Sequence, residues 1–357
     1  MRMCNLKRIA SLVLTLSVII AAVSCEHKEL CYYHPHVAPV RVNVDWSLFT
    51  MEDPTGMTAY AYPLHEDDND IYRFISHNID YITLSLEAGF FHTLVFNQSE
   101  SEYGTLEFSN LEDYNTAQVR VVQAQANWYS TKAPETKVGS EPEWLGVGRA
   151  ENIEVTEEMV KIAEEEYLAS RKDMMRSLGR AINNVATVTP ISVIKQVEFR
   201  VYAEGLYNLR SVRASVDGMS EGCILSTGEN IEGKVGHTVD IWDVETEETD
   251  ITRGDLVAKL GTFGIPKGHK GAPEENKFTI HLLLVDNSTT LDYDFYIGDI
   301  LSQFNDLDGS NGEIQKVVVE LKLPERLPDV KPVGGVGGGF DMDFDDWGDE
   351  IVTVIPN

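Results

Sequence analysis

Short runs typical of β-strands follow one another along most of the chain, and in the first of them apolar and polar residues alternate, which is the pattern of a strand buried on one face. The first four runs are Val40–Trp46, Gly56–Pro63, Ile79–Leu86 and Phe90–Phe96. Further runs rich in β-branched and aromatic residues are 105–108, 117–125, 191–202, 212–216, 224–225, 238–244, 258–263, 277–286, 293–297 and 315–323. Turn residues such as Ala203-Glu204-Gly205 separate them. Regular short strands joined by turns predict a mainly β protein built from antiparallel sandwiches.

A helical pattern interrupts the strands, after a looser stretch that ends near Arg149. Thr156 suits an N-cap, two glutamates occupy the first turn, and Arg176 lies at the far end. The pattern predicts a helix over 156–178 that ends near Gly179. The apolar residues that follow a spacing close to 3.6 are Met159, Ile162, Ala163, Tyr167, Met174 and Leu178.

The length of 357 residues suits two domains of ordinary size. We expect an N-terminal sandwich over 40–185, with the helix between the two domains or at the end of the first. We expect a C-terminal sandwich over 186–325. Residues 326–357 begin with prolines and a run of glycines, so we expect a linker that does not pack, followed by an acidic, strand-like tail.

The chain begins with a basic start, an apolar run and the small residue Ser24. This order predicts a secretory signal peptide over 1–24, because the apolar run is too short for a spanning helix with those flanks. Residues 22–25 (Ala-Val-Ser-Cys) resemble a bacterial lipobox, in which the cysteine becomes the lipidated N-terminus. We therefore expect acyl chains such as palmitate on Cys25 and a tether over 25–39. An ordinary signal peptide with an incidental cysteine is the alternative.

The formal net charge is −29, from 58 acidic and 29 basic residues. Such an acidic surface repels phosphate backbones, which excludes nucleic acid as a partner. It also disfavours adsorption to anionic lipid through a basic patch, so membrane attachment would depend on the acyl chains.

Cysteine counting agrees with this picture. Cys4 leaves with the signal peptide and Cys25 carries lipid, so Cys31 and Cys223 remain. Two thiols provide neither a disulfide framework nor a zinc site, and a bridge between them stays open.

No motif of catalytic residues stands out. Ser192-Val193-Ile194-Lys195 matches the Ser-x-x-Lys motif of penicillin-binding enzymes, but the flanking β-run points the serine and the lysine to opposite faces. Carboxylate pairs for glycoside hydrolysis stay open, because spacing alone selects none among 58 acids. We expect no catalytic site.

Two segments invite a metal interpretation. His34-Pro35-His36 has no third ligand nearby. Asn305–Glu313 looks like a calcium loop, but aligning Asp306 with the first EF-hand position puts Asn311 where glycine belongs and Val317 where the bidentate glutamate belongs. A turn between two strands explains the segment better, and we expect neither metal nor cofactor.

The tail carries a further alternating pattern. Phe340, Met342 and Phe344 fall on one face of a strand and three aspartates on the other, and Ile351–Ile355 also alternates. One interpretation is an edge strand with a solvated outer face. The other is an interaction strand that docks its apolar face on this protein or a neighbour by β-augmentation.

These pieces together resemble the fimbrillin-like lipoproteins of Bacteroidales, in particular a DUF-type family of uncharacterised fimbrillin-related proteins. The resemblance covers most of the mature chain, and its motifs are structural. It rests on the lipobox with Cys25, the strand pair 40–46 and 56–63, residues 84–97 (Leu-Ser-Leu-Glu-Ala-Gly-Phe-Phe-His-Thr-Leu-Val-Phe-Asn), Thr189-Pro190, 212–220, 225–229, and the Gly-rich linker with 340–347.

The resemblance implies two transthyretin-like sandwiches in tandem and a place in, or at the base of, surface fimbriae. In polymerising members of the family, an arginine-specific protease removes the first strand and a donor strand from the next subunit fills the groove. The candidate strand-exchange residues in this chain are Val40, Val42 and Val44 in the first strand and Phe340, Met342 and Phe344 in the tail.

One departure from the family pattern concerns processing. Arg41 lies inside the first strand rather than in a loop after it, and the next arginine is Arg73. The departure favours an anchor, accessory or tip-type subunit that keeps its lipid over a shaft subunit.

The expected function is that of a non-enzymatic, lipid-anchored outer-membrane protein, exposed on the cell surface in a fimbrium and serving adhesion. Its partners would be other fimbrial subunits through β-strand addition, the outer membrane through the lipid, and a surface receptor or glycan. The alternative is a glycan-binding lipoprotein of a polysaccharide-uptake system. That function needs two or three exposed aromatic rings on one face, whereas the fimbrial function buries most rings.

Overall fold

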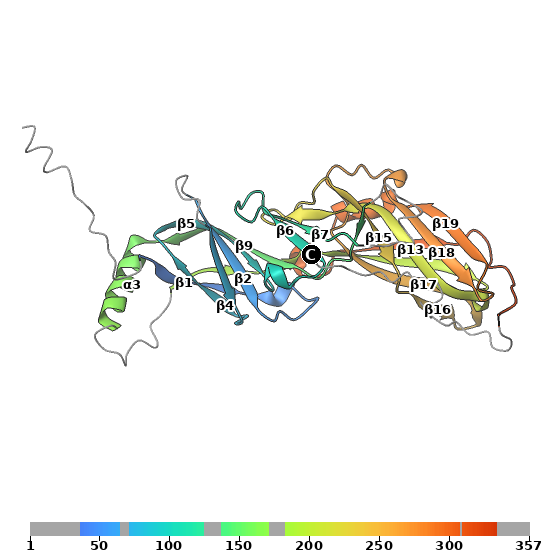
Figure 1. Ribbon diagram of the computed structural model, residues 1–357, viewed down its shortest axis with the longest axis horizontal. Coiled ribbons are helices and arrows are strands. Elements are labelled where there is room, and N and C mark those ends of the chain that lie inside the picture. Colours follow the sequence, from blue (N-terminus) through green and yellow to red (C-terminus); the bar gives the residue numbers. More distant parts are fainter. Residues whose placement is uncertain (1–35, 65–70, 125–136, 171–182, 308, 334–357) are drawn as a thin grey trace, which may run out of the picture.

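The computed structural model describes residues 36–64, 71–124, 137–170, 183–307 and 309–333. They form an elongated molecule, with α3 (Glu157–Ser170) at one end and the sheets of the C-terminal half at the other (Figure 1). The signal peptide, Cys25 and the strands expected at 340–347 and 351–355 lie outside the described residues. No helix in the described part of the chain is both long and apolar enough to cross a membrane.

Two sheets enclose the core of the N-terminal half. The first, here the β1 sheet, has the order β10-β1-β4, with β1 Ala38–Val44, β4 Tyr81–Leu86 and β10 Asn183–Val188. The second, here the β2 sheet, has the order β11-β9-β5-β2-β3, with β2 Met57–Pro63, β3 Tyr72–Ser76, β5 Gly89–Phe96, β9 Gly146–Val155 and β11 Ile191–Ser192. Apolar side chains from the facing surfaces of both sheets form one buried cluster.

The β2 sheet is buried on both faces. A small sheet of β6 (Leu106–Ser109), β7 (Gln118–Val121) and β14 (Gly222–Ile224) supplies residues of the cluster on its second face. Because successive residues of a strand point to opposite faces, Ala59 packs toward the β1 sheet and Tyr60 packs toward the small sheet. The first six residues of β2 are therefore all buried.

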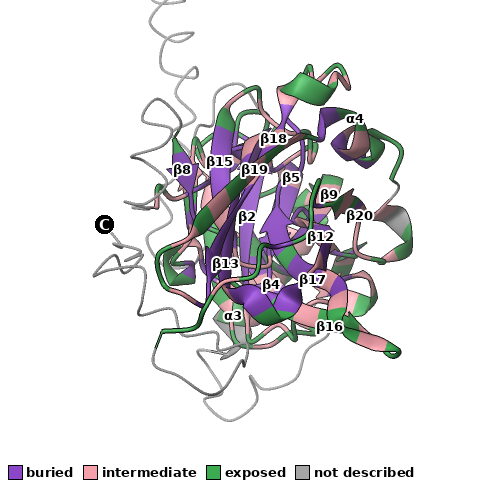
Figure 2. Ribbon diagram, turned by 90° about the vertical axis from the view of Figure 1, so that its right-hand side faces the viewer, coloured by how far each residue is buried: buried purple, intermediate pink, exposed green. Residues whose placement is uncertain are grey.

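The C-terminal half is a second sandwich. Its first sheet has the order β16-β17-β12-β20, with β12 Lys195–Glu204, β16 Asp243–Glu247, β17 Asp250–Thr262 and β20 Lys316–Lys322. Its second has the order β19-β18-β13-β15-β8, with β8 Val138–Gly139, β13 Leu209–Ser220, β15 Lys234–Val239, β18 Lys277–Leu284 and β19 Thr290–Tyr296. The rings of Phe199 and Phe278 stack between the sheets with centroids 4.5 Å apart. In the end-on view the buried strands lie inside these layers (Figure 2).

The described residues contain few helices. Thr156 caps α3 as expected, since its Oγ1 accepts a hydrogen bond from the N–H of Met159 at 3.2 Å. The structure thus confirms a helix over Glu157–Ser170, and residues 171–178 lie outside the described part. The remaining helical turns are α4 (Gly298–Leu301) and the 3₁₀ turns η1 Trp46–Leu48, η2 Glu100–Glu102, η3 Leu206–Asn208, η4 Pro273–Glu275, η5 Ser302–Asn305 and η6 Gly309–Asn311.

The prediction of a mainly β protein made of antiparallel sandwiches is confirmed, but three strand pairs differ from it. β1 with β10, β12 with β20, and β8 with β15 are parallel. Parallel partners need a long crossover between them, and in each case a large part of the chain separates the two strands. Alternation along a single run contains no information on such distant partners.

The sequence pattern also misses β9, whose first residues fall in the looser stretch expected to end near Arg149. A side-chain carbon added at Gly146 would lie 2.8 Å from the ring of Phe49, and one at Gly148 would lie 3.1 Å from Pro190. These positions of the strand lack side chains because neighbouring groups pack directly on the backbone.

The expectation of a linker that does not pack is wrong for residues 326–333, which pack against the C-terminal sandwich. Leu327 is fully buried, and its N–H donates to the carbonyl of Glu204 at 2.8 Å. The N–H of Val333 donates to the carbonyl of Val285 at 3.2 Å. Proline fixes the backbone without preventing side-chain packing, so a proline-rich segment can lie along the end of a sandwich.

The two halves exchange short strands. β8, which belongs to the first half by sequence, pairs with β15, and β14 of the second half pairs with β7. One apolar cluster continues from Tyr60 through Val119 to Phe199. Strands from both sides of residues 185 and 186 thus share sheets. The domain boundary expected there stays a prediction.

The β7–β14 contact leads to a stability prediction. A Cβ at Gly222 would lie 2.0 Å from the carbonyl oxygen of Val119, so Gly222→Ala forces the strands apart. We expect the free energy of unfolding to fall by roughly 1–3 kcal/mol in urea titrations. Gly104→Ala is the control, because the nearest atom to its added Cβ is a flexible carboxylate oxygen at 4.0 Å. Equal stability of the two variants would contradict the strand exchange.

Candidate functional site

The described residues contain no group of three or more His, Cys, Asp or Glu side chains placed to hold a metal ion. Asn305–Glu313, which looked like a calcium loop, contains the 3₁₀ turn η6, and Asn311 Nδ2 donates to Glu313 Oε2 at 2.9 Å. Ser192 Oγ donates to the carbonyl of Ile194 at 2.9 Å, while Lys195 Nζ lies 5.6 Å from the ring centroid of Phe304. The Ser-x-x-Lys pair therefore has separate structural contacts.

Two buried titratable groups lie at the junction of the halves. Cys223 in β14 is a fully buried free thiol, and burial raises its pKa to about 12. His237 in β15 is also buried, which lowers its pKa to about 4, and its Nδ1 lies 3.2 Å from the carbonyl oxygen of Gly139. Both groups are neutral at pH 7, as packing groups in a core are. Cys31 lies outside the described residues.

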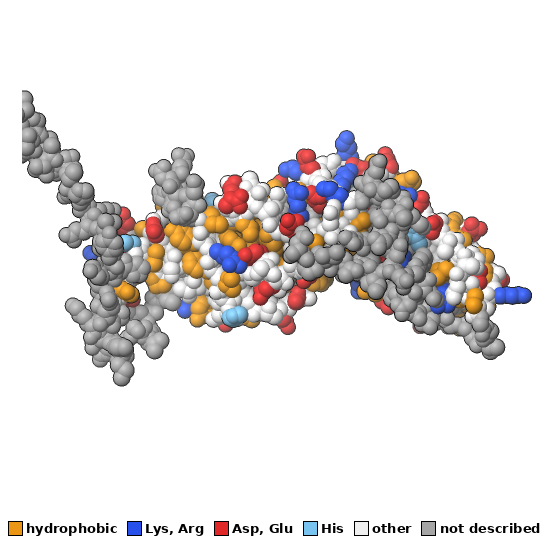
Figure 3. All heavy atoms as spheres, viewed as in Figure 1, with side chains coloured by type: hydrophobic (Ala, Val, Ile, Leu, Met, Phe, Trp, Pro, Cys, Tyr) orange, Lys and Arg blue, Asp and Glu red, His pale blue; other side chains and the backbone are white. Residues whose placement is uncertain are grey.

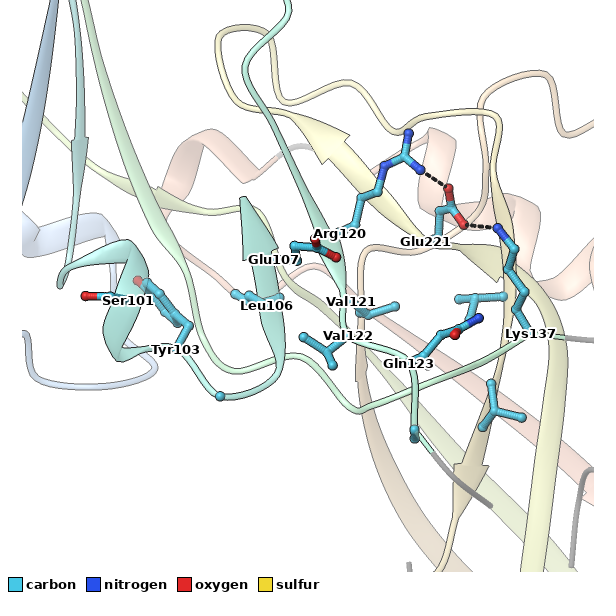
Figure 4. A pocket seen from close by; sticks show the side chains of 15 residues that line it. Ser101, Tyr103, Leu106, Glu107, Arg120, Val121, Val122, Gln123, Lys137 and Glu221 are labelled. Carbon is cyan, nitrogen blue, oxygen red and sulfur yellow. Dashed lines mark hydrogen bonds and ion pairs between the residues drawn. The ribbon is translucent and has the colours of Figure 1, made fainter. Parts of the chain in front are cut away.

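A cavity of about 670 Å³ opens beside the junction (Figure 4). Glu221 lies between two cations there, with its carboxylate 2.8 Å from Arg120 Nη1 and 3.5 Å from Lys137 Nζ. Among the described residues that line the cavity, Tyr103 is the one aromatic, and its hydroxyl donates to Asn97 Oδ1 at 2.8 Å. The cavity is lined by Ser101, Tyr103, Gly104, Leu106, Glu107, Arg120, Val121, Val122, Gln123, Ala124, Lys137, Val138, Gly139, Glu221 and Val235.

The positions of the aromatic rings bear on glycan binding. Trp242 is fully buried, and Trp46 and Trp144 are partly buried against the core clusters. The exposed large aromatic residues of the described chain are Phe90 in β5, Tyr167 in α3, Tyr207 in η3 and Tyr296 in β19. They come from four separate elements, so no single strand or helix of the described residues carries two of them. Trp128 and Trp347 lie outside the described residues.

The first strand is the best-defined candidate site. β1 is the central strand of its sheet, and its register pairs Val42 with Ala186 of β10 on one side and Ile82 of β4 on the other. Val40 and Val42 have no exposed surface and Val44 has 7%. The structure thus brings the three predicted valines into the core between the β1 and β2 sheets, with both backbone edges of β1 paired.

Arg41 is also held in place within β1. Its guanidinium carbon lies 3.9 Å above the centroid of the Tyr81 ring, a cation–π contact across the β1–β4 pair. The peptide bonds that flank Arg41 belong to the ladders on both sides of β1. An arginine-specific protease needs an extended chain whose backbone is accessible; the chain at Arg41 is extended, but its backbone is already paired on both sides.

Helix α3 covers the start of β1. Met159, Val160 and Ala163 pack against the cluster that contains the three valines. His36, just before the strand, approaches Glu164 of the helix with Nδ1 and Oε1 2.6 Å apart. Release of β1 would therefore also expose the apolar face of α3.

The C-terminal segment leaves the molecule at the opposite end. Arg326 and Asn208 hold Asp329, with nitrogen–oxygen distances of 3.2 and 3.1 Å, and the hydroxyl of Tyr207 donates to the same carboxylate. The described chain ends at Val333, beside the end of β18. Phe340, Met342 and Phe344 lie outside the described residues, and the sequence contained no signal for the packed segment that positions their exit.

Comparisons with known proteins bear on this arrangement. A family model described as "Domain of unknown function (DUF5119)" matches residues 24–240. A curated relative from Bacteroides ovatus, named "Putative fimbrium anchoring subunit Fim4B", is 22% identical over 96% of this chain and 96% of its own length.

Two solved structures are similar to this chain. A "putative adhesin" from Bacteroides ovatus is 15% identical, with a TM-score of 0.53 that covers 86% of this chain and 99% of that one. The fimbrial anchor protein Mfa2 from Porphyromonas gingivalis is 11% identical, with a TM-score of 0.44 over 80% of this chain and 90% of that one. The first of these likenesses shows the same overall fold.

The burial of β1 leads to a prediction for its central valine. Val42→Ala should lower the free energy of unfolding by about 2 kcal/mol, because it removes two fully buried methyl groups and leaves a cavity. Ile75→Ala on β3, whose side chain is 56% exposed, should cost less than about 1 kcal/mol. Chemical denaturation measures both, and equal costs would show that β1 is not part of the cooperative core.

Proposed function

The chain belongs to the DUF5119 family, and we propose that it is a non-enzymatic anchor subunit of a surface fimbrium, tied to the outer membrane by the lipid on Cys25. In this role the N-terminal end stays at the membrane and the tail joins the first subunit of the filament by β-strand addition. Adhesion is then a property of the filament that the protein holds.

The observation that carries the proposal is the double pairing of β1. A subunit in the middle of a filament needs an open groove to accept a donor strand. Here β1 fills that place from within the chain, with β10 and β4 on its two sides and Arg41 inside the ladder. A subunit that keeps its own strand accepts no donor there, which suits the first position of a filament.

The two ends of the molecule support the same role. Strand β1, which follows the expected tether, lies with α3 in the N-terminal half, and Val333 is bonded to Val285 at the far end of the C-terminal sandwich. The alternating tail beyond Val333 has the apolar face that a donor strand needs, in Phe340, Met342 and Phe344. The end-to-end coverage of the relative named as a fimbrium anchoring subunit is a further support.

Limited proteolysis tests the retention of β1. The soluble chain from Glu26 onward is treated with an arginine-specific protease under native conditions, and the fragments are sequenced from their N-termini. We expect no fragment that begins at Val42, because its bond to Arg41 lies inside two strand ladders. The urea-unfolded chain is the control and should be cut there. A native fragment beginning at Val42 would identify this chain as a processed shaft subunit.

Immunogold electron microscopy on intact cells tests the anchor role. We expect gold at the base of filaments in the wild type and detached, gold-bearing filaments in a Cys25→Ala strain, because acyl chains provide the membrane attachment. Gold along the whole filament would contradict the anchor role. Gold over a cell surface without filaments would favour the glycan-binding alternative.

A further inference from the structure

The end of the molecule from which the tail departs carries exposed apolar side chains that the fold does not use. Ile251 is 75% exposed, Val333 67% and Tyr207 45%. We call these three residues the distal patch. Isolated exposed apolar residues are common on protein surfaces. The position of these three relative to the tail is therefore what could make them an interaction site.

Backbone contacts place the three residues at the same end. The N–H of Gly205, two residues before Tyr207, donates to the carbonyl of Thr252, next to Ile251, at 2.8 Å. Val285 joins the other two residues: its N–H donates to the carbonyl of Asn208, next to Tyr207, at 2.9 Å, and its carbonyl accepts from the N–H of Val333 at 3.2 Å. Figure 2 looks at this end, where the tip of the β16–β17 hairpin is exposed, and Figure 3 shows apolar side chains among charged ones there.

The length of the linker limits where a partner can lie. Phe340 follows Val333 by seven residues, which reach at most about 25 Å when fully extended. Any subunit that accepts a strand beginning at Phe340 must therefore sit within that distance of Val333. A folded sandwich is itself tens of ångströms wide, so it meets the end of this molecule.

Three ion pairs lie around the patch. Arg253 Nε lies 2.7 Å from Asp250 Oδ2, and Lys322 Nζ lies 3.5 Å from Glu204 Oε1. Arg326 and Asp329 form a third pair. These six side chains are already paired within the chain, whereas the apolar side chains of the patch are exposed.

We propose that the distal patch is the docking surface for the fimbrial subunit that accepts the tail, a β-sandwich protein that brings an apolar surface beside its acceptor groove. The proposal rests on the anchor function. The patch holds the partner's body while the tail fills the groove, and two linked contacts reinforce each other through their high effective concentration.

The test measures how much filament protein stays with the membrane and how much is shed into the medium, in cells that carry one of three variants. Ile251→Asp changes the patch and leaves the tail intact. Ile75→Asp is the matched control, because Ile75 is also an exposed strand isoleucine but lies in the N-terminal half. Deletion of 340–357 removes the tail and tests the anchor function. Thermal unfolding of the purified variants checks that each is folded.

We expect Ile251→Asp to raise filament shedding by about tenfold, since a buried charge at an apolar contact costs on the order of one factor of ten in affinity or more. Ile75→Asp should shed like the wild type. If Ile251→Asp retains filaments while the tail deletion sheds them, the docking surface is refuted and the anchor function stands. If the tail deletion also retains them, both proposals fail. Val333→Asp, which keeps the backbone hydrogen bond, should repeat the effect of Ile251→Asp.

Discussion

The hydrogen-bonded position of β1 between β10 and β4 decides how this protein takes part in an assembly. Full burial of a valine contributes at least about 1.5 kcal/mol, so the three valines together contribute roughly 5 kcal/mol. That is a large share of the 5–15 kcal/mol by which domains are usually stable. β1 cannot leave unless another strand takes its place, and α3 packs over its start. The N-terminal sandwich is therefore complete within one chain.

The interlocked halves extend this constraint over the length of the molecule. β8 and β14 each pair with a strand of the other half, and one apolar cluster runs through the junction. A pull applied at the tail is passed through paired strands to the end where the tether begins, without a flexible linker between sandwiches. Such construction suits a protein that connects a membrane to a filament.

Local periodicity predicted much of this structure, and its failures have physical causes. β1 and β4 alternate clearly, because one face of each strand is directed toward the core. β2 and β5 were predicted from their β-branched and aromatic residues instead, and they are buried more continuously. β9 was not predicted as a strand. Its glycines leave room for Phe49 and Pro190, which lie far away in the sequence, so the local pattern does not indicate a strand. Pairing partners such as β10 depend on tertiary structure, which no single run of residues encodes.

The candidate site, too, was predictable from the sequence only in part. The apolar face of Val40, Val42 and Val44 was visible in the sequence, and its burial follows from that pattern. The distal patch was not visible, because Ile251 lies outside the runs that the sequence predicts as strands and belongs to β17 only in the structure. Leu327 and its neighbours were hidden by prolines that indicate a free linker.

The most direct measurement of the central claim is mass spectrometry of the protein isolated from the outer membrane of cells that make it. If the chain keeps β1 and serves as the anchor, its N-terminal peptide begins at Cys25 and carries acyl chains. A mature protein that begins at Val42 or later, without lipid, would show that β1 is removed in the cell and would contradict the account.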